Sequence, residues 1–285
     1  GKLPITIHKS DMTGIHYESP VASAQIKSAV LLATLGASGK TSFKEPILSR
    51  NHTEKMLHGL GANISIDGLT VTISNLTSPL SNFEISVPGD PSTAAFFAAS
   101  AALVPNSEIV LNRVLANPLR TGLFAALERM GAGMECLDQW DEAGERIGNL
   151  KIFHQPMIGI SITKTGVPGL IDELPIIAIL ATQAKGETEV RGAEELRVKE
   201  CDRIHAVCKN LKNMGADIEE LDDGFIINGP TPLNGTTIET FHDHRITMAF
   251  TIAGLIAEGD TVLNHPKCVS ISYPEFFDVL EQLKQ

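Results

Sequence analysis

The densest group of charged side chains in this sequence lies in the segment GAEELRVKECDRIHAV, residues 192–207. It holds two cations four residues apart, Lys199 and Arg203, which would share one face of a helix and repel unless an anion lay between them. Glu200 precedes Arg203 by three residues, so its carboxylate can be held by Arg203 and left to exchange protons with a substrate. The alternative is a series of solvent-exposed ion pairs without a ligand, which is the commoner explanation of such a run of charged residues.

Two further arginines stand at predicted helix starts, where a cation is unfavourable next to the positive end of the helix dipole. Arg50 lies with Ser49 in the turn SRNHTEK, and Arg245 lies with His244 in DHRITMAF. Their position indicates an anion near the helix start, such as a phosphoryl group. His244 also fits a packed imidazole with no role in binding.

Ser23, Ala24 and Gln25 open another predicted helix, where backbone N–H groups are available to a phosphate. Capping alone explains Ser23 as well as ligand binding does. Asp172 and Asp243 stand at two more helix starts, and capping accounts for both of these carboxylates. The nine histidines include no HxxxH or HExxH pattern, and no cysteine pair accompanies them, so we expect no metal.

The candidate residues at helix starts belong to a pattern that the sequence repeats. In each copy an Ala-rich helix ends in a short turn and is followed by a run of β-branched residues. The four copies start at Ala22, Asp90, Asp172 and Asp243. In the first three, a second helix follows and ends at a glycine suited to the left-handed conformation: Gly61, Gly131 and Gly215. The spacing of roughly 70 to 80 residues fits a βαβαββ unit and is too long for a solenoid repeat.

The polar stretch before residue 87 predicts a domain boundary. Residues 1–86 would then form one unit of a first domain, and residues 87–285 a domain of three units. A lone unit would leave apolar faces uncovered, so either partner units of the first domain are missing or the fragment associates with another molecule. We expect a chain that is truncated at its start.

Bulk composition narrows the function classes. Of 285 residues, 43% are hydrophobic and only 5% aromatic, and the net charge is −11, which disfavours a nucleic-acid-binding protein. No apolar run reaches the roughly 18 residues of a membrane helix. Four cysteines without a paired motif favour reduced thiols and a cytoplasmic protein.

The motifs SAQIKSA, PGDPSTAAFF, RTGLFAALERMGA, LRVKECDR and DHRITMAF together resemble the EPSP synthases, and the resemblance spans the whole chain. It implies an α/β fold, the inside-out α/β barrel of the enolpyruvyl transferases, with one three-unit domain complete and one unit of the second. It also implies transfer of the enolpyruvyl group of phosphoenolpyruvate to the 5-hydroxyl of shikimate 3-phosphate, in aromatic amino acid biosynthesis, without a cofactor.

The resemblance assigns roles to individual residues. Shikimate 3-phosphate would be bound by the segment from the first repeat and by one lysine: Ser23, Ala24, Gln25, Ser49, Arg50 and Lys199. Phosphoenolpyruvate would be held by Arg203 and Arg245, with His244 at its border. Asp172 would take the proton from the 5-hydroxyl, and Glu200 would serve proton transfer at the methylene carbon.

Two departures from the family pattern accompany these assignments. The C-terminal lysine of some members is replaced here by Ser270 and Ile271, and the N-terminal motifs that contribute to the phosphoenolpyruvate site do not precede Gly1. We therefore expect a fragment that is inactive alone. The alternatives are a UDP-N-acetylglucosamine enolpyruvyl transferase, whose reactive-cysteine loop is not visible, and a non-catalytic module that binds phosphometabolites.

Overall fold

The computed structural model describes residues 4–82 and 84–284. The chain divides into two compact units, and the boundary in the sequence falls between Ser86 and Val87. The first unit also takes the hairpin tip Asp141–Glu145, while the second holds Val87–Trp140 and Arg146–Gln285.

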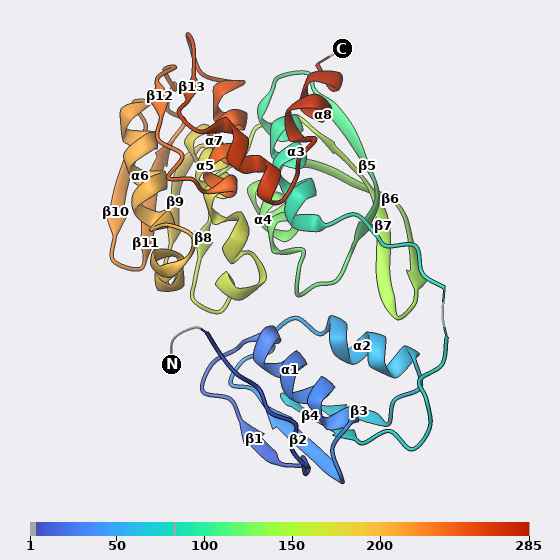
Figure 1. Cartoon of the computed structure of the whole chain (residues 1–285). Coiled ribbons are helices and arrows are strands. Elements are labelled where there is room, and N and C mark those ends of the chain that lie inside the picture. Colours follow the sequence, from blue (N-terminus) through green and yellow to red (C-terminus); the bar gives the residue numbers. More distant parts are fainter. Residues whose placement is uncertain (1–3, 83, 285) are drawn as a thin grey trace. The chain divides into compact units, whose positions relative to one another are not determined.

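The first unit is a four-stranded sheet with two helices on one face (Figure 1). The strands are β1 (His16–Glu18), β2 (Lys40–Lys44), β3 (Ile64–Asp67) and β4 (Thr70–Ser74), and the helices are α1 (Ala24–Leu35) and α2 (His52–Gly59). The sheet order is β1-β2-β4-β3, with β1 parallel to β2 and the other neighbours antiparallel. Strand alternation places Phe43, Val71 and Ile73 against Leu31 and Leu57 of the helices in one small core.

The second unit contains three sheets. The four-stranded sheet has the order β10-β11-β9-β8, the three-stranded sheet the order β5-β7-β6, and β12 pairs with β13. The strands are β5 (Glu108–Leu115), β6 (Gly133–Glu142), β7 (Glu145–Phe153), β8 (Ser161–Ile162), β9 (Gly186–Val190), β10 (Asp217–Leu221), β11 (Gly224–Gly229), β12 (Thr237–Ile238) and β13 (Val262–Leu263).

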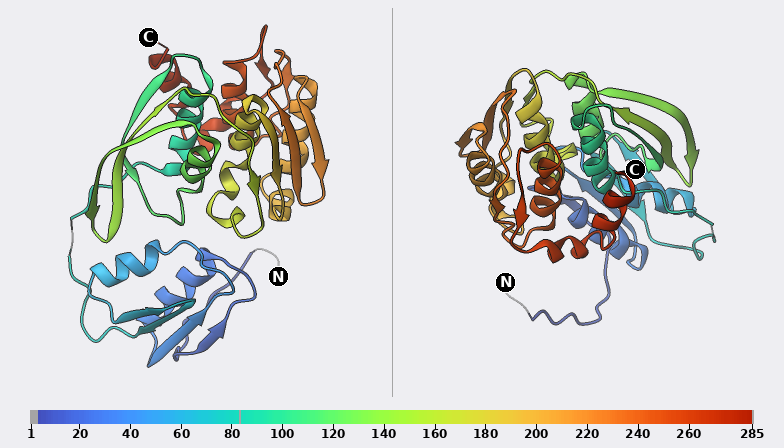
Figure 2. Two further views of the ribbon diagram at one scale, coloured as in Figure 1. Left: turned by 180° about the vertical axis from the view of Figure 1, so that it is seen from behind. Right: turned by 90° about the horizontal axis from the view of Figure 1, so that it is seen from above.

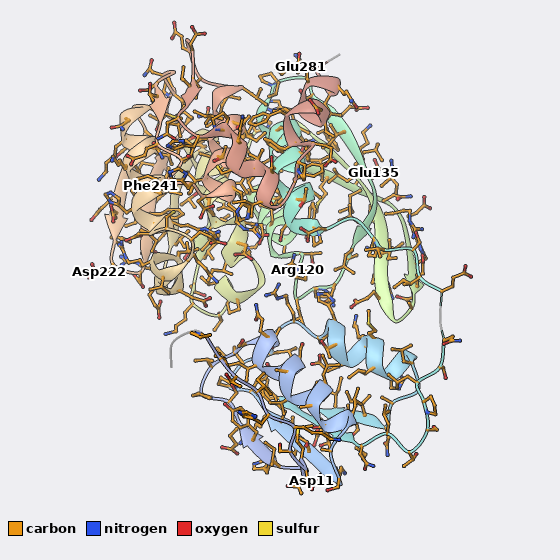
Figure 3. All side chains as sticks on the ribbon, viewed as in Figure 1. Asp11, Arg120, Glu135, Asp222, Phe241 and Glu281 are labelled. Atoms are coloured by element: carbon orange, nitrogen blue, oxygen red, sulfur yellow. The ribbon has the colours of Figure 1, made fainter. Side chains whose placement is uncertain are left out.

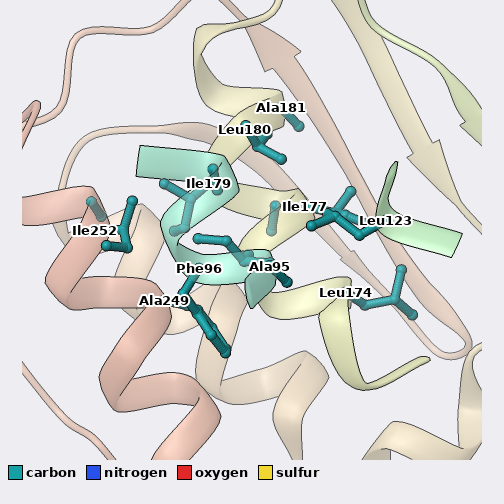
Figure 4. Packing of buried hydrophobic residues seen from close by; sticks show 14 of the residues in the cluster. Ala95, Phe96, Leu123, Leu174, Ile177, Ile179, Leu180, Ala181, Ala249 and Ile252 are labelled. Atoms are coloured by element: carbon teal, nitrogen blue, oxygen red, sulfur yellow. The ribbon is translucent and has the colours of Figure 1, made fainter. Parts of the chain in front are cut away.

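Three helices form the centre of the second unit, with the larger sheets outside them (Figure 2). The helices of this unit are α3 (Pro91–Leu103), α4 (Gly122–Met130), α5 (Leu174–Gln183), α6 (Arg203–Asn213), α7 (His244–Gly254) and α8 (Phe276–Gln282), and short 3₁₀ helices cover Val167–Gly169, Ile171–Glu173, Glu194–Val198 and Pro266–Ile271. The helices α3, α5 and α7 pack on one another (Figure 4). Small side chains such as Ala95 and Ala249 permit this close approach, and almost every residue of α3 and α5 is buried.

The predicted helices of the four copies are present as α1, α3, α5 and α7. Gly131 ends α4 at φ 79°, and Gly61 and Gly215 also adopt positive φ, as their places after a helix predict. The four-stranded sheets of the two units have the same strand order in sequence terms, since β1-β2-β4-β3 corresponds to β8-β9-β11-β10. The chain is therefore a mixed α/β protein in which one arrangement of strands occurs twice.

Two expectations about single segments are wrong. Lys199 and Arg203 do not share a helix face, because Asp202 caps α6 and the helix begins at Arg203, while Lys199 ends a 3₁₀ helix in extended conformation. Asp172 does not cap α5: it lies inside a 3₁₀ turn, and its carboxylate is engaged by arginines instead.

Candidate functional site

In the first unit, the candidate phosphate-binding residues lie at the start of α1 and in the loop between β2 and α2. Ser23 is the N-cap of α1, and its Oγ accepts a hydrogen bond from the N–H of Ile26 at 3.4 Å. Ala24 and Gln25 belong to the first turn, whose N–H groups have no carbonyl partner within the helix. Ser23 can therefore cap α1 while other backbone N–H groups of the first turn donate to a ligand.

Arg50 is half-buried, two residues before the start of α2, and forms no ion pair among the described residues. Its neighbour Ser49 donates its hydroxyl hydrogen to Glu45 at 2.5 Å. The hydroxyls of Ser28 in α1 and Thr53 in α2 are 2.6 Å apart and join the two helix starts. A cation without a carboxylate partner beside two helix N-termini is suited to bind an anion.

In the second unit, two arginines converge on Asp172. Arg203 reaches Asp172 Oδ1 at 3.2 Å through Nη1, and Arg245 reaches Asp172 Oδ2 at 3.4 Å through Nη2. The Asp172 side chain is 24% exposed and that of Arg245 is 15% exposed, so this pair remains accessible to solvent at its edge. The arrangement combines a proton acceptor with a cation able to bind a carboxylate or phosphate.

Arg203 itself is buried, with a side-chain exposure of 1%, and it contacts three carboxylates. Its Nε lies 2.7 Å from Asp243, and Nη2 lies 2.5 Å from Glu200. Asp243 caps α7 with its other oxygen, which accepts from the N–H of Arg245 at 2.8 Å. Glu200 is thus held by Arg203 as the sequence predicts, but the Arg203 guanidinium is already surrounded by carboxylates.

His244 is buried at the start of α7. Burial, reinforced by the charge of neighbouring Arg245, lowers the pKa of its imidazole below the usual value. The ring is therefore neutral at neutral pH and adds no positive charge to the cluster. Lys199 lies apart from these contacts and pairs with Glu195 at 2.5 Å.

Glu173 was not singled out as a site residue by its sequence pattern, yet it lies next to Asp172 and is almost fully buried. Burial raises the pKa of its carboxyl group, while a hydrogen bond with Ser92 and the charge of Arg245 act in the opposite direction. Arg120, in the loop before α4 (Figure 3), donates to Ser92 at 2.9 Å and to Asp90 at 2.6 Å. Sequence reasoning treated acidic residues here as caps, so it missed this buried carboxyl.

Cys201 also lies in this cluster, with its sulfur 3.7 Å from Asp243. Burial, reinforced by the Asp243 charge, raises the pKa of the thiol to about 12. The thiol is protonated at neutral pH and is a poor nucleophile.

No group of three or more potential metal ligands occurs among residues 4–82 and 84–284. In the same part of the chain, no helix has the length and apolarity to cross a bilayer.

A family model described as EPSP synthase (3-phosphoshikimate 1-carboxyvinyltransferase) matches residues 1–280. A relative from Persephonella marina (strain DSM 14350 / EX-H1), named 3-phosphoshikimate 1-carboxyvinyltransferase, is 47% identical over 285 residues, covering 99% of this chain and 66% of the relative. A relative of the same name from Alkaliphilus oremlandii (strain OhILAs) is 46% identical over 283 residues with the same coverage. The chain thus spans slightly less than two thirds of these relatives, 66% of their length.

Solved structures give the same result. EPSP synthase from Acinetobacter baumannii matches with a TM-score of 0.90 and 39% identity, covering 96% of this chain and 63% of that one. The enolpyruvyl transferase NikO from Streptomyces tendae matches with a TM-score of 0.72 at 18% identity, covering 97% and 65% of the two chains, which is a likeness of fold. By the family model and by these relatives, the chain belongs to the EPSP synthase family.

Proposed function

We propose that this chain contributes the substrate-binding and proton-transfer residues of an enolpyruvyl transferase that joins phosphoenolpyruvate to the 5-hydroxyl of shikimate 3-phosphate. The observation that carries the proposal is the contact of Asp172 with both Arg203 and Arg245, beside Glu200. It supplies a base, a second carboxyl group and a partly exposed cation within one cluster. The names of the relatives supply the substrate class.

The phosphate of shikimate 3-phosphate binds to the first turn of α1 at Ser23, Ala24 and Gln25, and to Ser49 and Arg50. The guanidinium of Arg50 forms no ion pair within residues 4–82 and 84–284, which supports this assignment. Lys199 contacts the shikimate ring.

Phosphoenolpyruvate binds through Arg245, with Arg203 behind it and His244 at the border. Because Arg245 is paired with Asp172 in the free chain, the arriving anion competes for that guanidinium and weakens its hold on Asp172. Asp172 then accepts the proton of the 5-hydroxyl as the oxygen attacks the phosphate-bearing carbon, and Glu200 delivers a proton to the methylene carbon. Loss of inorganic phosphate and of one proton from the resulting methyl group restores the double bond, and no cofactor enters this balance.

The proposal also extends to the detailed fold, which we infer to be that of the enolpyruvyl transferases. The repeated strand order supports an inside-out α/β barrel of βαβαββ units, with three units in residues 87–285 and one in residues 1–86. Because the chain covers 66% of its relatives, a further segment of about the remaining third completes the active site. The chain would work in the cytoplasm, with shikimate 3-phosphate and phosphoenolpyruvate as its small-molecule partners.

The test is calorimetric binding followed by turnover. Shikimate 3-phosphate is titrated into the chain, and phosphate release is then measured with both substrates, for the chain alone and with the separately produced remaining third of a relative. Asp172→Asn should leave binding of shikimate 3-phosphate intact and reduce turnover by about 100-fold or more, as loss of a general base does. Binding of shikimate 3-phosphate no tighter than that of inorganic phosphate would contradict the proposal.

The non-catalytic alternative predicts binding without phosphate release under every condition. The alternative of a sugar-nucleotide enolpyruvyl transferase has less support, because the relatives are named for shikimate 3-phosphate. Turnover with UDP-N-acetylglucosamine in place of shikimate 3-phosphate distinguishes this case.

A further inference from the structure

Lys27 is a fully buried cation in the first turn of α1, directly after the candidate phosphate-binding residues. Such a position is doubly unfavourable, because burial removes water from the ammonium group and the helix dipole is positive at this end. The cost is offset by two carboxylates. Lys27 Nζ lies 2.9 Å from Glu45 Oε1 and 2.7 Å from Glu54 Oε1, and both glutamates are buried.

The two glutamates differ in what else they contact. Glu45 accepts the hydroxyl of Ser49 on its second oxygen, whereas the second oxygen of Glu54 is buried without a hydrogen-bond partner among the described residues. Lys27 also donates to the main-chain carbonyl of Ser49 at 3.4 Å. Ser49 is therefore held at two points, once directly by Lys27 and once through Glu45.

This link joins the two parts of the candidate phosphate site. Lys27 is in α1, which begins at Ala24 directly after its N-cap Ser23. Ser49 precedes Arg50, which forms no ion pair with any residue that the structure describes. A fully buried ammonium group cannot touch a ligand in this arrangement, so its effect on binding must pass through the loop. A phosphate recognised by donors from both segments requires their separation to be fixed before it arrives.

We propose that Lys27 and Glu45 are positioning residues, which fix Ser49 and Arg50 relative to the start of α1 for the phosphate group of shikimate 3-phosphate. The inference rests on the proposed function, because it concerns the phosphate site assigned there. It goes beyond that function in assigning a binding role to two buried residues outside the site. Glu54 compensates the charge of Lys27 but does not hold the loop.

The difference between the glutamates provides a matched pair of variants. Glu45→Gln and Glu54→Gln each replace a buried carboxylate beside Lys27 with an amide of the same shape, so a purely structural role predicts similar effects of both. We expect Glu45→Gln to weaken the binding of shikimate 3-phosphate by about 10-fold, the effect of misplacing one or two hydrogen-bond donors. Glu54→Gln should change it by less than about 2-fold. Titration calorimetry measures both, and thermal unfolding checks that both variants are folded.

A second route removes the link from the loop side, in case Glu45→Gln does not fold. Because Ser49 is also assigned a direct contact with the phosphate, Ser49→Ala should lose at least as much affinity as Glu45→Gln. Where Glu45→Gln folds, the double variant should lose no more than Ser49→Ala alone, because Glu45 acts on the loop through the Ser49 hydroxyl. Binding of phosphoenolpyruvate should be unchanged in all of them.

The outcomes separate the two claims. If the parent chain binds shikimate 3-phosphate and the two glutamine variants lose equal affinity, the positioning role is wrong and the proposed function stands. Additive losses in the double variant also overturn the positioning role. If the parent chain does not bind shikimate 3-phosphate, the proposed function fails and the positioning role fails with it.

Discussion

At the scale of single residues, carboxyl groups outnumber guanidinium groups in the second-unit cluster. The two arginines, Arg203 and Arg245, are surrounded by Asp172, Glu173, Glu200 and Asp243. Any anion that binds at this cluster must therefore compete with the internal carboxylates for an arginine. Arg245 is the more exposed of the two arginines, so it is the one open to such competition.

Replacing Arg245 should affect one substrate selectively. In Arg245→Gln we expect the affinity for phosphoenolpyruvate to fall by about 20-fold or more, the size of one charge-assisted pair, with shikimate 3-phosphate binding nearly unchanged. The matched control is Arg191→Gln, which removes an exposed arginine paired with Glu189 and Asp223 in the same unit. Separate titrations of the two substrates measure the effect, and an equal loss for both would contradict the assignment.

The raised pKa of Glu173 predicts a pH effect on stability. A carboxyl whose pKa is higher in the folded than in the unfolded state stabilises the fold fully below the unfolded value, and this contribution is lost as pH rises through the folded value. The groups that act on it are Ser92, Arg245, Asp172 and Arg120.

Glu173→Gln removes this titration. The variant should therefore gain stability relative to the parent as the pH rises above the ordinary carboxyl pKa of 4.5, because only the parent then has to ionise a buried carboxyl group or keep it protonated. Urea unfolding at several pH values measures the difference. A constant difference across these pH values would show that Glu173 keeps an ordinary pKa.

At the scale of secondary-structure elements, close strand contacts depend on individual glycines. Gly224 begins β11 beside β9, and a Cβ atom there would lie 1.9 Å from the carbonyl oxygen of Val190. Gly224→Ala should therefore cost about 2 kcal/mol or more in the free energy of unfolding, since backbone must shift to admit the methyl group. Gly169→Ala, where a Cβ atom meets nothing within 4 Å, is the control and should stay within about 0.5 kcal/mol. Chemical denaturation compares the two.

The elements were largely predictable from sequence, because their signals are local. Asp90 and Asp243 cap α3 and α7 with their side chains, and Gly131 ends α4 in the left-handed conformation. The start of α6 was misjudged because several charged residues in a row fit a longer helix equally well. Only the capping of His205 N–H by Asp202 fixes the first turn at Arg203.

The candidate site was less predictable, because its contacts join residues distant in sequence. A cation at a helix start correctly indicated a nearby anion at Arg245, but the anion found there is Asp172 of the protein itself. Lys27 carries the same signal, a cation in a first turn, and was overlooked within the apolar pattern of its helix. Periodicity cannot reveal that Glu45 and Glu54 neutralise it, since they come from a strand end and another helix.

At the scale of the whole molecule, residues 87–285 are predicted to fold independently. They contain the three central helices and their own core, and the second compact unit consists of these residues without the hairpin tip Asp141–Glu145. Residues 87–285 produced alone should give one cooperative unfolding transition and slow amide exchange in α3, α5 and α7. In the full chain, slow exchange confined to residues before 87 would contradict independent folding.

Asp243 has one oxygen on the start of α7 and the other on Arg203 of α6. The carboxylate of Asp243 thus caps α7 and also orients the guanidinium of Arg203. Asp243 stands two residues before Arg245, the other arginine of the cluster. A laboratory selection for expression level alone would retain this aspartate for the sake of folding. It would thereby preserve the geometry of both arginines in a library never exposed to substrate.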